Sequence, residues 1–172
     1  MECQCSLTKE QTALLLRESK VADDNRTATF QPVDGQDSAL KNKYLELLRT
    51  AAVNAALDQT NRFGLQTFYT AGMENVYYCA EMDSFAVMEL EETKLRLQSI
   101  VSAKHVSVRE VLCRVPLAFE EVLLGFTPCG DEKEQFTLTP YDGGEDYVLY
   151  YMGEGMKDFA EQKLLFPEFS HA

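Results

Sequence analysis

The sequence lacks a long apolar run and is short of basic residues. No apolar stretch approaches the ~20 residues that cross a bilayer, and the N-terminus does not resemble a secretory signal. Only 16 Lys and Arg stand against 28 Asp and Glu, which gives a net charge of −12. This charge disfavours nucleic acid and anionic membrane surfaces as direct ligands, because both attract a basic face. We therefore expect an intracellular, cytoplasmic protein whose partner is another protein with a basic patch.

Residues that build metal or nucleophilic sites are also scarce. The five cysteines are odd in number and suggest no disulfide framework. Cys3 and Cys5 form a close thiol pair, but no second pair completes a four-ligand zinc site. A nucleophilic thiol would need His105 as its base, yet Cys113 falls on the apolar side of a predicted helix and acids beside Cys129 would raise its pKa. The sequence predicts no catalytic residue, no metal site and no cofactor.

The clearest helix signal covers residues 37–64. Its apolar residues recur at spacings of three and four, so they share one face. They are Leu40, Tyr44, Leu47, Leu48, Ala51 and Ala55. Asp37 or Ser38 can cap the start by accepting from a first-turn amide, and Gly64 can end the helix in the left-handed conformation. We expect this long central helix to pack on most of the fold.

Strands are predicted on both sides of that helix. Residues 27–33 have β-branched and aromatic content, and Pro32 makes this an edge strand because proline has no amide donor. Residues 65–70 and 75–82 are typical of a hairpin with a four-residue loop. Residues 84–103 fit a strand followed by a helix, or a single helix. Strand then helix is favoured, because the first apolar residues alternate between two sides.

A second helical region is predicted at residues 107–125. Ser107 and Glu110 have the spacing of a capping box. Pro116 lies inside the region, so it either kinks one helix or belongs to the first turn of another. Gly125 can end the region. Beyond it, strands are predicted at 135–139 and 147–152, and a short helix at 154–165.

Together these elements predict an α+β fold. It has a single antiparallel sheet of roughly four to six strands, packed on one face by the long central helix (37–64) and the second helical region (107–125). The strands come as hairpins, which argues against a doubly wound parallel sheet. Residues 1–7 are predicted to be a disordered tail, and residues 8–172 a single α+β domain.

Acidic residues concentrate in the last quarter of the chain. Residues 130–172 hold ten acids and three bases, a net charge of −7. Surface acids accelerate encounter with a basic partner, and tyrosines supply contact area once the partner has docked. The predicted partner-binding residues are Asp142, Glu145, Asp146, Tyr147, Tyr150, Tyr151 and Glu154. Phe68, Tyr69, Tyr77 and Tyr78 also fall on predicted strands. Some of these rings would join such a surface if one face of the sheet stays uncovered, while core packing accounts for most of the aromatic residues.

These observations favour a protein–protein interaction module of adaptor, chaperone-like or inhibitory type, rather than an enzyme. An alternative is a small-ligand-binding domain, or an enzyme with a pocket between sheet and helices. A second alternative is an acidic mimic of nucleic acid that occupies a basic groove. Association into homo-oligomers is compatible with each hypothesis.

Overall fold

The computed structural model describes residues 2–22, 28–58, 62–141, 153–154 and 158–170. The strands are β1 (Cys3–Leu7), β2 (Gln31–Pro32), β3 (Val76–Cys79), β4 (Ser84–Glu91), β5 (Lys94–Ser102), β6 (Glu121–Leu124) and β7 (Thr137–Pro140). The α-helices are α1 (Lys9–Ala22), α2 (Ser38–Thr50), α3 (Phe63–Tyr69) and α4 (Val108–Leu112). Short 3-10 helices are η1 (Gly130–Gln135), η3 (Asp158–Glu161) and η4 (Glu168–Ser170).

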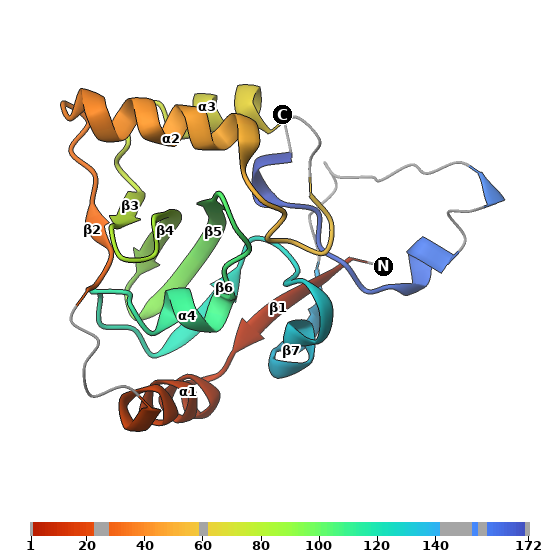
Figure 1. The fold of residues 1–172 in the computed structure, drawn as a ribbon. Helices are drawn as coiled ribbons and strands as arrows, with labels where there is room; N and C mark the ends of the chain where they lie inside the picture. Colours follow the sequence, from red (N-terminus) through yellow and green to blue (C-terminus); the bar gives the residue numbers. More distant parts are fainter. Residues whose placement is uncertain (1, 23–27, 59–61, 142–152, 155–157, 171–172) are drawn as a thin grey trace.

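One sheet joins all of these strands (Figure 1). It has seven strands in the order β2-β3-β4-β5-β6-β1-β7. The α+β class is confirmed, but the predicted four to six strands and the purely antiparallel pairing are wrong. β6 runs parallel to β5. The connection between them includes α4 and returns the chain to the end of the sheet where β5 begins, so both strands run in the same direction. Pro32 lies on an edge strand, as predicted.

Helices cover both faces of this sheet. Along β4, Phe85 and Val87 pack in one core with α2. Ala86 and Met88 pack in a second core with α1 and α4. The predicted alternation at the start of residues 84–103 is therefore confirmed. The prediction that both helical regions cover one face is wrong, because α2 and α4 lie on opposite sides (Figure 1).

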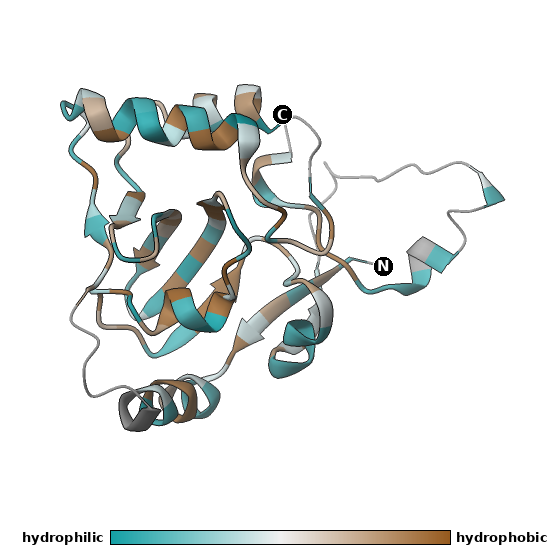
Figure 2. Ribbon diagram, in the orientation of Figure 1, coloured by the Kyte–Doolittle hydropathy of each residue, from teal (hydrophilic) through white to brown (hydrophobic). Residues whose placement is uncertain are grey.

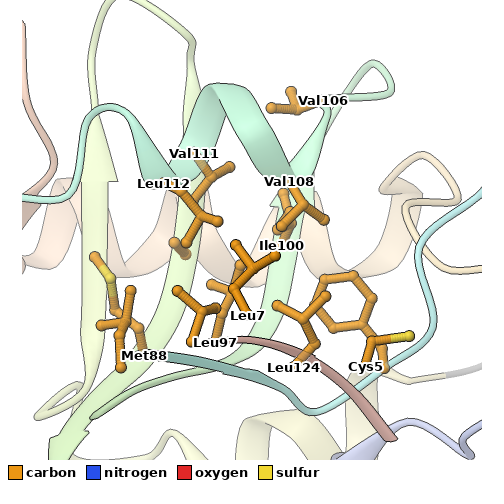
Figure 3. Packing of buried hydrophobic residues seen from close by; sticks show 14 of the residues in the cluster. Cys5, Leu7, Met88, Leu97, Ile100, Val106, Val108, Val111, Leu112 and Leu124 are labelled. Carbon is orange, nitrogen blue, oxygen red and sulfur yellow. The ribbon is translucent and has the colours of Figure 1, made fainter. Parts of the chain in front are cut away.

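The second core is shown in close-up in Figure 3. Side chains from β1, β4, β5 and β6 meet those of α4 there, including Val111 and Leu112, which are almost inaccessible to solvent. Figure 2 shows hydrophobic residues alternating with hydrophilic ones along α2 and the strands. On α2 the alternation lets the helix bury one side in a core and expose the other. Residues 84–88 of β4, in contrast, are buried on both faces of the sheet.

The N-terminal residues 1–7 were predicted to be a disordered tail, and the structure contradicts this. Residues 3–7 form β1, which pairs with β6 on one side and β7 on the other. Cys3 and Cys5 are only 3% and 0% exposed. Free cysteine behaves as a small hydrophobic residue, so the Cys-Gln-Cys-Ser-Leu sequence has the apolar and polar alternation of a strand. Because β1 has only five residues, this alternation was too short to predict a strand from the sequence alone.

The predicted helix 37–64 is shorter in the structure. Its start is confirmed, because the Asp37 carboxylate accepts from the amides of Ala39 and Leu40 at 3.0 Å. The helix ends at Thr50, and the alanine-rich stretch after it is extended. The amide of Ala52 donates to the Ser102 carbonyl, and the amide of Ala56 donates to the Thr127 carbonyl. Backbone bonds to other segments thus replace the helical bonds that the alanines would have favoured.

Residues 63–69 form α3, so the predicted strand at 65–70 is wrong, and Gly64 lies inside this helix instead of ending one. The hairpin is formed by β3 and β4 instead. Residues 91–103, where the sequence predicts a helix, contain the whole of β5. There, Leu95 and Leu97 alternate with polar neighbours and are fully buried.

In the predicted helical region 107–125, only α4 is helical, and residues 121–124 form β6. The capping box is confirmed, since the amide of Glu110 donates to Ser107 Oγ at 3.2 Å and the return bond is also present. Pro116 lies in the loop after α4, so it neither kinks nor starts a helix. Gly125 follows β6, and a Cβ there would lie 2.6 Å from the carboxylate of Glu168. The lack of a side chain at Gly125 therefore allows η4 to pack against the sheet.

The predicted strand at 147–152 lies outside the described residues. The strand predicted at 135–139 is present as β7, which covers residues 137–140. The predicted helix at 154–165 is reduced to η3 in the described part of that range. Leu164 and Leu165 are buried there without helical structure.

Candidate protein-binding site

Most of the predicted acidic and tyrosine surface cannot be placed. Of the predicted partner-binding residues, Glu154 is described, and it is exposed. The others lie outside the described residues and are Asp142, Glu145, Asp146, Tyr147, Tyr150 and Tyr151. Their role in binding stays a prediction.

In the described part of the chain, no hydrogen bond joins His105 to a cysteine thiol. Burial raises the pKa of the Cys5 thiol to about 11. Burial first, and then the charges of Asp58 and Glu132, raise the pKa of the half-buried Cys129. His105 is exposed, with its Nδ1 atom 3.3 Å from a backbone carbonyl oxygen. Within the described ranges, no group of three or more His, Cys, Asp and Glu could hold a metal ion.

Among the residues that the structure describes, the most exposed aromatic side chains lie on α3. Phe68 is 75% exposed and Tyr69 is 49% exposed. Residues 63–73, which contain both, hold no charged residue, although the chain as a whole is 26% charged. Both belong to the larger group of aromatic residues that the sequence predicts on strands, but they lie on a helix. Their exposure comes instead from the outer face of a short helix.

Buried hydrogen bonds hold α3 on the sheet. Gln66 is 1% exposed, and its side-chain amide donates to Tyr44 Oη at 3.2 Å and to Ser99 Oγ at 3.1 Å. The Thr70 hydroxyl donates to the Gln66 carbonyl at 2.7 Å. Burial raises the pKa of Tyr44 to about 12, so its hydroxyl stays neutral. Because an unpaired amide would be costly in this interior, these bonds fix the orientation of the helix.

Both ends of α3 have further support. Before the helix, the Arg62 guanidinium lies 3.3 Å from the Asp58 carboxylate, and both side chains are nearly buried, at 11% and 12% exposure. Arg62 also donates to the Ala52 carbonyl at 2.9 Å. At the end of the helix, the Tyr69 ring lies on the Phe169 ring of η4, with 5.6 Å between centroids. Contacts at both ends therefore hold α3, the helix that carries the exposed rings of Phe68 and Tyr69.

A small hollow lies under α3, between the helix and β5. Its lining includes Asn54, Asp58, Arg62 and Gln66, and its volume is about 20 Å³. That is room for about one water molecule. This hollow is where a pocket between sheet and helices was expected, and it is far smaller than the ~300–1,000 Å³ of a typical small-molecule site.

Two larger hollows flank the turn that follows α3. One has a volume of about 140 Å³ and is mostly polar. The other, against α2, has a volume of about 190 Å³ and is mostly apolar. Thr70 and Met73 line both. Each hollow is below the usual size of a small-molecule or cofactor pocket.

Comparison of the chain with protein families, curated proteins and solved structures found no match. In the described part of the chain, no helix combines the length and apolar character needed to cross a membrane.

Proposed function

We propose that this protein is a protein–protein interaction module and that the outer side of α3 is its contact surface. The observation that carries the proposal is the exposure of Phe68 and Tyr69 on an uncharged segment of a strongly acidic chain. Aromatic residues are enriched among the residues that dominate binding energy at interfaces. The hydrogen bonds of Gln66 support the proposal, because a fixed helix loses little entropy when a partner docks.

The charge of the chain supports a basic partner. A net charge of −12 attracts a basic protein and speeds its association at low salt. The predicted acidic and tyrosine residues between 142 and 154 would add to this attraction, so we include them in the proposal as a second contact region. We place the protein in the cytoplasm, where its five cysteines would stay reduced.

The alternative functions have less support. A ligand-binding or enzymatic role would use the pocket between sheet and helices, and that hollow has a volume of about 20 Å³. A mimic of nucleic acid would need regularly spaced acids on the surface, and the segment with the most exposed aromatic rings has no acids at all.

The proposal is tested by affinity capture with matched variants. The parent, the double variant Phe68→Ser with Tyr69→Ser, and the control Leu14→Ser would be used as baits, and captured proteins would be quantified by mass spectrometry. Leu14 is also an exposed apolar residue, at 57%, but lies on α1. We expect a basic protein that the α3 variant loses and the Leu14 variant keeps, followed by direct binding with the purified protein. A partner retained equally by all three baits would contradict the proposed surface.

A further inference from the structure

The polar hollow beside α3 combines aromatic rings with a carboxylate. Tyr69 and Phe169 line it, and their rings are tilted by 30° with centroids 5.6 Å apart. Glu74, Asn75 and Gln98 line it as well, and none of its described lining residues is basic. Aromatic rings attract cations through their negative faces, and carboxylate and amide oxygens accept hydrogen bonds from them.

Glu74 is the charged group that is available in this hollow. It is exposed, and in the described part of the chain it makes no hydrogen bond and no ion pair. Its side chain lies close to Gly72, where an added Cβ would be 3.5 Å from it. The nearby Glu168 differs, because Arg96 lies 3.1 Å from its carboxylate and the Gln98 amide donates to it at 2.9 Å. Among the described residues, Glu74 thus has no ion-pair partner, whereas Glu168 is paired with Arg96.

The position of Gln98 follows from an irregularity in the sheet. The pairing of β4 with β5 shifts between Val87 and Met88, so Gln98 has no partner in the register. A bulge of this kind redirects a side chain out of the regular alternation. Gln98 can thus reach both Glu168 and the hollow, and its donated bond leaves the amide oxygen as an acceptor.

We propose that this hollow binds a positively charged side chain, arginine or lysine, of a basic protein partner. The inference rests on the proposed function and names the chemistry of the contact. The volume of about 140 Å³ suits one side chain rather than a cofactor. A second copy of the chain is disfavoured as the occupant, because two molecules that each carry −12 repel one another.

The test needs no identified partner. The ¹⁵N-labelled protein would be titrated with three probes at matched ionic strength: Nα-acetyl-arginine amide, Nα-acetyl-lysine amide with a free side-chain amine, and Nα-acetyl-citrulline amide. Citrulline has nearly the shape of arginine without its charge. We expect the cationic probes to shift the amide resonances of Tyr69, Gly72 and Glu74, and citrulline to leave them in place. The first two probes show whether guanidinium or ammonium binds better.

The variant Glu74→Gln should bind the cationic probe roughly threefold more weakly, because it removes an ion pair that is exposed to solvent and therefore contributes modestly to affinity. The control Glu134→Gln removes an exposed acid on η1 and should bind as the parent does. Equal shifts with citrulline, or parental affinity in Glu74→Gln, would overturn the inference.

Failure here is separable from failure of the proposed function. Phe68 does not line the hollow, so partner loss in Phe68→Ser alone supports the contact surface even if no cationic probe binds. Conversely, a bound probe combined with unchanged capture by Phe68→Ser would leave the hollow as a cation site and remove α3 as the docking surface.

Discussion

Leu48 offers a sharp test of how α2 packs on the sheet. It is 3% exposed and belongs to the core that contains Tyr44, Phe85 and Val101. The change Leu48→Ala removes buried carbon atoms and leaves a cavity, which costs about 2–5 kcal/mol. In a chain of this size each kcal/mol lowers Tm by roughly 2–4 °C. We therefore expect a fall in Tm of about 4–20 °C.

The adjacent residue supplies a matched control. Leu47 is half-buried, so Leu47→Ala should cost under about 2 kcal/mol because less buried surface is lost. Urea unfolding followed by circular dichroism would give the free energy of unfolding, and an unchanged m-value would show that the folded and unfolded states are comparable. If Leu48→Ala unfolds like the parent, or if Leu47→Ala is the more damaging change, the orientation of α2 described above is wrong.

Two further predictions concern β1 and its thiol. Deleting residues 1–5 removes most of an interior strand that pairs with both β6 and β7, so the truncated chain should lose its cooperative melting curve by circular dichroism; a parental curve would refute the interior position. Burial raises the pKa of Cys5 from 9.0 to about 11, so between these pH values the unfolded chain loses a proton that the folded chain keeps, and stability falls as pH rises. The loss should reach roughly 2–3 kcal/mol at pH 11. Unfolding at pH 8.5 and pH 10.5 should therefore show a steeper loss in the parent than in Cys5→Ala, and parallel slopes would count against the assignment.

Features that depend on neighbouring residues could be predicted from the sequence. The Asp37 cap, the Ser107–Glu110 capping box and the alternation around Phe85 were all recognised correctly. So was the edge position of Pro32. Each rests on a hydrogen bond or a side-chain direction within a few residues, so the local pattern contains the whole physical cause.

Features that depend on residues far away in the chain could not be predicted from the sequence. The alanines after Thr50 favour a helix, but their amides bond to residues 102 and 127 instead. The β-branched and aromatic residues of 63–69 favour a strand, yet the segment is helical and buries Gln66 against Tyr44 and Ser99. Local propensities differ by about 1 kcal/mol or less per residue. Tertiary contacts of this size and number easily override them.

The same distinction between local and distant causes applies to the candidate site. Composition alone determined that the protein is acidic, and the sequence named Phe68 and Tyr69 only among seven aromatic residues on predicted strands. Their exposure, and the hollow that brings Glu74 together with Gln98 and Phe169, were decided by the tertiary structure. The hollow is assembled from segments up to about a hundred residues apart, which meet because a bulge in β5 and the docking of η4 place them together. No local pattern encodes such a meeting, since it depends on the sum of packing interactions across the whole sheet.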